Sequence, residues 1–376
     1  MKLLSWLIIP IFLLTAVQFT LSNIKLLKFP AQDFEVFYLS GKQVLKTENP
    51  YLKLGQDIVR NPPPTIIIFS LLPLLPILTS QAIWFIVSFL TFLVASFFLF
   101  KILEANNWKI WLTFLSLSFL FFPFRYNLGS GQVNNLLFLL IVLAFYFTKN
   151  RKIYKAAISV ALAIAIKITP LFFLLVFLFQ KKIKQFFCTL ISLGILLLVT
   201  SPFLTFNIYK YYFSISNSYL DFTNESYYNQ SLAALINRLV HNPNIAQTIV
   251  VFISIMSILV FSLLITKVKQ NLLSDIIIWN ISILYILILA PFAWQYHFVI
   301  IIFPLVTTAY LLVKGKMSYS FYLLLGLSYF MIGWNIKNPQ VFEKVNILGG
   351  VILSHVVLGA ILLLLLNYSL LKKLLR

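Results

Sequence analysis

Long uninterrupted apolar runs dominate this sequence and decide its fold class. Residues 136–147 and 356–366 carry no charged side chain, and similar runs recur along a chain of 376 residues with a mean hydropathy of +0.96. A transmembrane barrel is built instead from short strands in which apolar and polar residues alternate. The pattern therefore predicts an all-α polytopic membrane protein, with residues 1–376 forming a single integral membrane domain.

Basic residues predict how the chain is oriented. Clusters of Lys and Arg occur in short connections, at 149–155, 181–184, 267–269, 314–316 and 372–376. An excess of Lys and Arg marks the cytoplasmic loops of membrane proteins, so we expect these connections and both termini to lie in the cytoplasm. The first outer loop, 23–81, and a second large outer loop, 203–246, then lie outside the cytoplasm.

Between these anchors we expect a bundle of about twelve transmembrane helices, within a range of roughly 11 to 13. The expected crossings are 3–22, 82–103, 110–123, 135–148, 156–168, 170–180, 185–202, 247–266, 273–290, 298–313, 319–334 and 346–368. Residues 65–79 are also apolar, but a crossing there would place the basic loop 149–155 outside. We interpret them as an interfacial helix that is broken by Pro73 and Pro76.

The net charge of +20 bears on the partners of the protein. Lys and Arg are dispersed in short loops, so we expect anionic lipid headgroups and an anionic lipid-linked substrate rather than nucleic acid. The single cysteine, Cys188, excludes an intrachain disulfide framework and a multi-cysteine zinc site. The three histidines are too widely separated for metal-ligand spacing, so we expect neither a metal nor a cofactor.

Carboxylates are scarce, and Asp33 and Glu35 stand together just after the first apolar segment. At the membrane surface a carboxylate is partly desolvated, which raises its proton affinity and suits a general base. On a strand the two side chains would share a face, whereas on a helix they would diverge. The alternative for both residues is an ordinary solvated position in a loop.

Lys167 is the most informative basic residue because apolar sequence surrounds it. We expect 156–180 to form a helical hairpin that turns at 167–170, since both of its flanks are basic and share one side. A charge inside the membrane is expensive and indicates a function, here the binding of an anion such as a phosphate. The alternative is a lysine that extends from a helix end to the interface.

A polar stretch at 125–135 separates two apolar helices. We interpret it as flexible, with glycines that permit close backbone approach. Gln132 and Asn134 offer the neutral hydrogen bonds that sugars need, and Arg125 adds a cation. An interhelical turn without a binding role explains the stretch equally well.

Two further clusters are expected on the outer side. Asn229 and Gln230 follow a tyrosine-rich segment, and aromatic residues with amides suit carbohydrate binding, although an interfacial tyrosine belt has the same composition. Trp294 and His297 lie at an outer helix junction. His297 could donate a hydrogen bond to an anionic leaving group, or it is simply a helix-end histidine at the interface.

Taken together, these pieces resemble glycosyltransferase family 87, the polyprenol-phosphate-mannose-dependent mannosyltransferases of the membrane-embedded GT-C superfamily. The resemblance covers most of the chain and rests on motifs that occur in the family's order. The motifs are Asp33-Phe34-Glu35, Asn49-Pro50-Tyr51, Pro62-Pro63-Pro64, Gly131-Gln132-Val133-Asn134, Lys167-Ile168-Thr169-Pro170, Asn229-Gln230-Ser231-Leu232 and Pro291-x-x-Trp294-x-x-His297. Asn61 stands where the family often has Tyr, and Tyr296 where it often has a first His, which leaves the identity of the donor open.

The resemblance implies a GT-C-type bundle and the transfer of a hexose, usually mannose, from a polyprenyl-phosphate sugar. The acceptor would be a lipid-linked or cell-surface glycan outside the cytoplasm. An inverting displacement needs one base, for which we favour Asp33 with Glu35 second. The leaving phosphate needs cations, for which we favour Lys167 and His297 with Arg125 third. The residues expected to bind the sugar or the acceptor are Gln132, Asn134, Asn229, Gln230 and Trp294.

A transporter or flippase of polyprenyl-linked glycans is the alternative function. It would use the same basic and aromatic features to bind its cargo without forming a bond. Inverted repeats would favour a transporter, and the sequence contains none that we detect. A structural membrane subunit is a third possibility, but it would leave Asp33 and Lys167 without roles.

Overall fold

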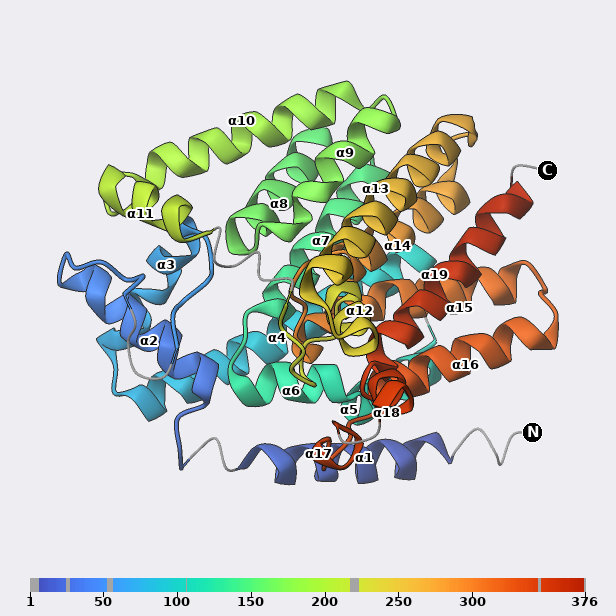
Figure 1. Ribbon diagram of the computed structural model, residues 1–376, viewed down its shortest axis with the longest axis horizontal. Helices are drawn as coiled ribbons and strands as arrows, with labels where there is room; N and C mark the ends of the chain where they lie inside the picture. Colours follow the sequence, from blue (N-terminus) through green and yellow to red (C-terminus); the bar gives the residue numbers. More distant parts are fainter. Residues whose placement is uncertain are drawn as a thin grey trace. The chain divides into compact units, whose positions relative to one another are not determined.

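The structure, a computed structural model, describes residues 7–24, 28–52, 57–105, 107–216, 223–343 and 346–374. Helices account for most of these residues (Figure 1). The prediction of an all-α polytopic membrane protein is confirmed. The start of the first expected crossing, 3–22, and the last residue of the final basic cluster, Arg376, lie outside the described residues.

Five helical segments in the described part of the chain are long and apolar enough to cross a membrane. They are α4 (Ile77–Leu103), α10 (Ile183–Thr200), α13 (Pro243–Lys267), η6 with α15 (Gln295–Lys314) and α19 (His355–Leu374). Shorter apolar helices make up the other expected crossings. These are α1 (Ile8–Asn23), α5 (Trp108–Leu120), α7 (Asn134–Lys149), α8 (Ile153–Ile166), η4 with α9 (Thr169–Phe179), α14 (Leu272–Ile288) and α16 (Tyr319–Gly333).

The number of crossings stays a prediction, because helices of this shorter kind do not span about 30 Å of hydrocarbon unaided. The apolar segment 65–79 forms a short helix, α3 (Pro63–Phe69), followed by the 3-10 turn η3 (Leu72–Leu74). Pro73 lies inside that turn and Pro76 precedes α4. The two prolines therefore break the segment where the sequence predicts.

The remaining helices are short, and all but the last of them, which begins the expected crossing 346–368, lie mainly in the expected connections. They are α2 (Gln32–Leu45), α6 (Phe122–Ser130), α11 (Phe206–Ser216), α12 (Leu232–Val240), α17 (Gln340–Glu343) and α18 (Asn346–Leu353). Both expected outer loops thus carry short helices.

Two sequence-based expectations are wrong in detail. The stretch 125–135 is not a flexible segment, because α6 continues through Ser130 and only 131–133 form a turn. Pro123 at the start of α6 and Gly131 just after its end are the residues that favour these helix boundaries. The crossing 346–368 is not one helix, because α18 ends at Leu353 and α19 begins at His355.

The chain divides into two compact units, one of residues 1–168 and 187–217, the other of 169–186 and 218–376. The expectation of a single integral domain stays a prediction. In the first unit α4 packs on α7, α7 on α8, α1 on α5 and α2 on α3. Rings from four of its helices pack together in the core. Phe19 and Phe119 stack with centroids 4.7 Å apart, and the rings of Phe92 and Phe124 are tilted with centroids 4.2 Å apart.

In the second unit α14 is almost wholly buried and packs against α9, α15 and α19. A polar network inside this unit fastens three helices together. Asn280 of α14 donates to Oδ1 of Asn367 at 2.9 Å and accepts from the hydroxyl of Thr307 at 2.7 Å, while Asn367 donates to Thr308 at 3.0 Å. All four residues are fully buried, so these hydrogen bonds take the place of those that their polar groups would make to water in the unfolded chain.

Candidate active site

Asp33 lies in the first turn of α2, whose apolar residues Phe34, Phe37 and Gly41 face the protein. The first turn of a helix favours carboxylates, because its free N–H groups carry partial positive charge. Asp33 is half-buried, whereas Glu35 is exposed. The two acids therefore diverge, as expected for a helix, and Asp33 is the one that faces other parts of the site.

The surroundings of Asp33 set its proton affinity. Burial raises the pKa of Asp33 above its usual value, while hydrogen bonds from Gln132 and Ser130 and the charge of Lys167 pull that pKa down. Burial is the largest of these influences. A carboxylate with raised proton affinity, held in place by two donors, is suited to accept a proton from a hydroxyl group.

The turn after α6 brings those donors to Asp33. Gly131 ends the helix with a φ of 77°, in the left-handed region that favours glycine. A Cβ atom at this position would lie 2.5 Å from Cβ of Phe34. Only a glycine permits so close an approach to α2, and this approach lets Ser130 and Gln132, on either side of Gly131, both reach Asp33.

Lys167 follows the last residue of α8 in an extended conformation and is half-buried. Its Nζ atom donates a hydrogen bond to Oδ1 of Asn134 at 2.7 Å. Asn134 is fully buried and donates in turn to Oδ1 of Asn127 at 2.9 Å. The side chain of Asn134 therefore orients the lysine. The sequence predicts only that Asn134 contacts the sugar or the acceptor.

Residues before and within α3 hold the end of α8, a role that their sequence alone does not indicate. Asn61 donates to the carbonyl of Ile166 at 3.0 Å, and Thr65 donates to that of Ala165 at 2.6 Å. The last carbonyls of a helix need such donors, and Pro170 shortly afterwards was a signal that the helix ends here. Asn61, at the family's frequent Tyr position, thus supports the backbone that carries Lys167.

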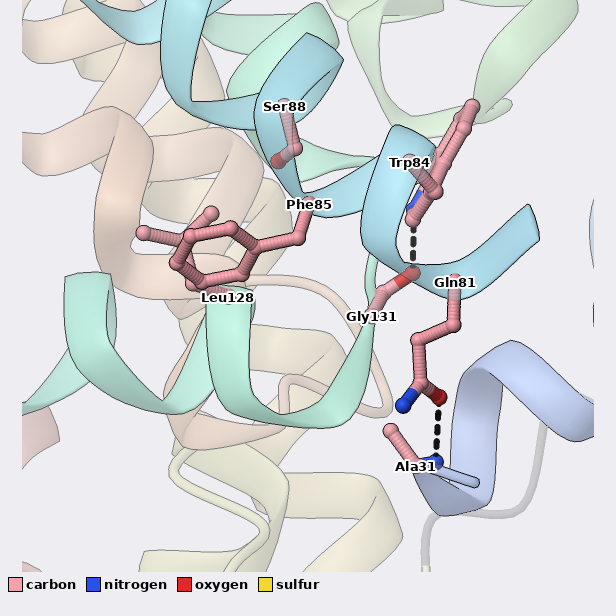
Figure 2. Close-up of a pocket in the computed structure, with 7 residues that line it drawn as sticks. All are labelled: Ala31, Gln81, Trp84, Phe85, Ser88, Leu128 and Gly131. Atoms are coloured by element: carbon pink, nitrogen blue, oxygen red, sulfur yellow. Dashed lines mark hydrogen bonds between the residues drawn. The ribbon is translucent and has the colours of Figure 1, made fainter. Parts of the chain in front are cut away.

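A small pocket lies behind the turn at Gly131 (Figure 2). Its lining residues are Ala31, Gln81, Trp84, Phe85, Ser88, Leu128 and Gly131. Two hydrogen bonds cross this region: Oε1 of Gln81 accepts from the backbone N–H of Ala31 at 2.6 Å, and Nε1 of Trp84 donates to the carbonyl of Gly131 at 2.7 Å.

Arg125, the third expected phosphate ligand, is half-buried on α6.

In the second unit, Asn229 and Gln230 are fully buried and bind backbone. Oδ1 of Asn229 accepts from the N–H of Ala293 at 3.0 Å, and Gln230 donates to the carbonyls of Tyr227 at 2.6 Å and Leu353 at 2.7 Å. Their amides therefore fix a loop. This geometry favours a role in holding the loop over direct contact with a sugar.

Arg238, which sequence reasoning missed, is a second support of the same loop. It lies buried on α12 and donates to the backbone carbonyls of Glu225, Ser226 and Asn229 and to the hydroxyl of Ser354. A guanidinium group can satisfy several carbonyls at once because its donors form a rigid fork. The sequence signal was a cation on the apolar side of an amphipathic helix.

Trp294 and His297 lie on a segment that pairs with this loop. A backbone bridge joins the two segments at Asn229 and Trp294. The N–H of Gln230 donates to the carbonyl of Ala293 at 2.8 Å, and the N–H of Gln295 donates to that of Tyr228 at 3.0 Å. Trp294 is half-buried, and its ring contacts those of Tyr228 and Phe292, with centroids 5.8 Å and 5.0 Å away. His297 is also half-buried and its ring lies 4.9 Å from that of Tyr296. The segment presents an aromatic surface with one imidazole.

Within the described ranges, no group of three or more His, Cys, Asp or Glu side chains is arranged to hold a metal ion. The first unit therefore brings together Asp33, Gln132, Asn134 and Lys167, and the second unit brings together Asn229, Gln230, Trp294 and His297.

These features define a class: a helical, multi-pass membrane protein with a polar site formed by a carboxylate, a lysine and amides at helix ends. The chain belongs to glycosyltransferase family 87, whose family model matches residues 60–284. It is therefore a membrane glycosyltransferase, and the resemblance inferred from its motifs is confirmed.

Solved structures offer a more distant likeness. The chain is similar to ArnT from Cupriavidus metallidurans in the apo state, with 12% identity, a TM-score of 0.44, and coverage of 99% of this chain and 78% of that one. It is also similar to the same protein bound to undecaprenyl phosphate, with 13% identity, a TM-score of 0.46, and coverage of 98% and 78%. None of the curated proteins matches the chain.

Proposed function

We propose that this glycosyltransferase moves a hexose, most simply mannose, from a polyprenyl-phosphate sugar to a lipid-linked or cell-surface glycan. One observation carries the proposal: Asp33 accepts hydrogen bonds from Gln132 and Ser130 and interacts electrostatically with Lys167. A base and a cation in one site suit a displacement in which a hydroxyl attacks and a phosphate leaves. The transporter alternative is set aside, because the chain belongs to a family of transferases.

In this mechanism Asp33 takes the proton of the acceptor hydroxyl as the oxygen attacks the anomeric carbon. The bond from that carbon to the phosphate oxygen breaks, and its electron pair leaves with the polyprenyl phosphate. A single displacement inverts the anomeric centre. Because Glu35 is exposed, it is the weaker candidate for the base.

Lys167 binds the departing phosphate, with Asn134 holding its ammonium group in place. The negative charge that develops on the leaving oxygen is stabilised by a positioned cation, and this replaces a general acid. Arg125, in the same unit, is a further candidate for this anion, and His297 in the second unit is a separate candidate for binding phosphate. Trp294 offers its ring to a sugar, and neither a metal nor a cofactor takes part. The site faces the extracytoplasmic side, and both termini are cytoplasmic, in line with the basic loops.

The donor class is tested with purified protein in lipid nanodiscs. Polyprenyl phosphates that carry radiolabelled mannose, glucose or arabinose are each supplied with a crude glycolipid acceptor pool, and labelled nucleotide sugars serve as the comparison. The proposal expects label to move to the acceptor from a lipid-phosphate sugar, most rapidly from mannose. Transfer from a nucleotide sugar in the absence of any lipid donor would overturn it. Arabinose or glucose as the preferred sugar would overturn the assignment of mannose alone.

A further inference from the structure

One face of α4 carries three polar side chains, Gln81, Trp84 and Ser88, that are buried and lie three and four residues apart. This spacing places them on one side of the helix. Each binds a different segment of the candidate site. We propose that these three residues position Asp33, Gln132 and Asn134 for the transfer reaction, and that Trp84 is the most important of them.

Gln81 holds the start of α2. Its Oε1 atom accepts from the N–H of Ala31 at 2.6 Å, and its Nε2 atom donates to the carbonyl of Phe29 at 3.0 Å. Ala31 caps the helix without a side-chain hydrogen bond of its own, so Gln81 supplies the polar contact at this helix end. Asp33 lies two residues further on and moves with this backbone.

Trp84 holds the turn that carries the donors of Asp33. Its indole N–H donates to the carbonyl of Gly131 at 2.7 Å (Figure 2). A Cβ atom at the same glycine would lie 2.5 Å from Cβ of Phe34, so α2 also packs closely on this turn. Because Ser130 and Gln132 flank Gly131, the indole sets how closely both donors approach the carboxylate.

Ser88 holds the start of α7. Both its carbonyl and its hydroxyl accept from Nδ2 of Asn135, at 3.2 Å and 3.1 Å. The preceding residue, Asn134, is the partner of Lys167. One helix face therefore sets the places of the carboxylate, its donors and the residue that orients the lysine.

The charges that act on Asp33 are those of Lys167 and Asp57. Among the elements packed against α2, α3 and η3 have no titratable side chain, α4 has Lys101 in its last turn, and α6 has Arg125 and Tyr126. The other titratable residues of α2 itself are Glu35, Tyr38 and Lys42. If the indole no longer holds Gly131, Asp33 loses hydrogen bonds to its ionised form. The carboxyl group then binds its proton more tightly.

The test measures protonation of Asp33 directly, because the role of Asp33 as base rests on the proposed function. A hydrophobic carbodiimide reacts with the protonated carboxyl group, and mass spectrometry of the peptide that contains Asp33 gives the extent of labelling at each pH. Trp84→Phe keeps a large apolar ring but removes the N–H donor. Trp108→Phe is the matched control, because Trp108 is 47% exposed at the start of α5.

In Trp84→Phe we expect the midpoint of labelling to move to higher pH by roughly one unit, the scale of a lost hydrogen bond to a charged group. The acid limb of the transfer rate should move by a similar amount, and Trp108→Phe should match the wild type. A merely structural role for Trp84 would lower the amount of folded protein without moving either midpoint, and that result would overturn the proposal.

A second variant covers the case in which Trp84→Phe does not fold. Gln81→Met removes the hydrogen bonds that Gln81 makes with Ala31 and Phe29, with little change in side-chain length, and the same direction of shift is expected. An unchanged labelling midpoint in this variant would also count against the proposal. The two ideas stay separable: a wild type that transfers no sugar contradicts the proposed function alone, since labelling of Asp33 still reports its protonation.

Discussion

Lys167 and Asn134 form a hydrogen-bonded pair in which the ammonium group donates to the amide oxygen at 2.7 Å. The pair joins the end of α8 to the start of α7, and Asn127 holds the amide from the other side at 2.9 Å. The lysine is therefore held in one orientation before any ligand binds. A cation fixed in this way binds an anion without first losing the freedom of a flexible side chain.

Replacing Asn134 by Leu tests this pair. A hydrogen bond to a charged group contributes about 1.5–3 kcal/mol, so polyprenyl phosphate should bind roughly 10- to 100-fold more weakly to Asn134→Leu. Lys167→Met should weaken binding at least as much. Because both residues act on one ligand through one contact, the double variant should lose little more than Lys167→Met does. Equilibrium binding of radiolabelled polyprenyl phosphate measures all three, and additive losses would contradict the pairing.

The raised pKa of Asp33 predicts how stability depends on pH. Between the usual carboxyl pKa and the raised value, the folded state binds more protons than the unfolded state. The contribution of this proton to the free energy of unfolding is fully present below the usual carboxyl pKa. It is lost as the pH rises through the raised pKa of Asp33 in the folded state. Asp33→Asn removes a partly desolvated charge, so the Tm of this variant should exceed that of the wild type at pH 7. The difference should shrink as the pH is lowered, and thermal unfolding in detergent across pH checks both statements.

The two glycines of α6 and its turn should respond in opposite ways to alanine. Gly131→Ala places a methyl group 2.5 Å from Phe34 at a φ of 77°, which forces α2 away from the turn. We expect a loss of about 1–3 kcal/mol in stability together with most of the transfer activity. Gly129→Ala has no atom within 4 Å of the new methyl group and should gain up to about 1 kcal/mol. Equal effects of the two variants would contradict the close approach at Gly131.

The polar network of the second unit should support stability rather than catalysis. Asn280→Leu leaves the buried groups of Asn367 and Thr307 without a partner from α14. Such a loss costs about 1–3 kcal/mol. The variant should therefore unfold at lower temperature, while the enzyme that remains folded keeps its transfer rate. Ser369→Ala, an exposed position on α19, serves as the control. A specific fall in the transfer rate would give the network a direct role in catalysis.

Much of this fold could be predicted from the sequence, because long runs of apolar residues indicate transmembrane helices. The break at Pro73 and Pro76 followed from proline geometry in the same way. Pro123 and Gly131 mark the ends of α6, but the polar composition of 125–135 favours a turn over a helix, so the sequence does not predict α6. The division of 346–368 at Ser354 had no comparable marker, since the sequence there stays apolar on both sides.

The candidate site was predictable only in part. Asp33 and Lys167 stood out because isolated charges are costly beside apolar sequence. The roles of Asn134 and Gln230 could not be derived, because a neutral amide serves equally well for a sugar or for a backbone group, and only the fold decides which is nearer. Gln81 and Trp84 gave no signal at all, since they lie inside an apolar helix far along the chain from the segments that they hold.

The most direct test of the account compares two acids that stand two residues apart on α2. Purified wild type, Asp33→Asn and Glu35→Gln are incubated with polyprenyl-phosphate [³H]mannose and a glycolipid acceptor pool, and the label in the product is counted. The account predicts that Asp33→Asn loses transfer by at least about a hundredfold, on the scale of a general base, while Glu35→Gln retains it. Transfer that survives in Asp33→Asn and fails in Glu35→Gln would contradict the assignment of Asp33 as the base.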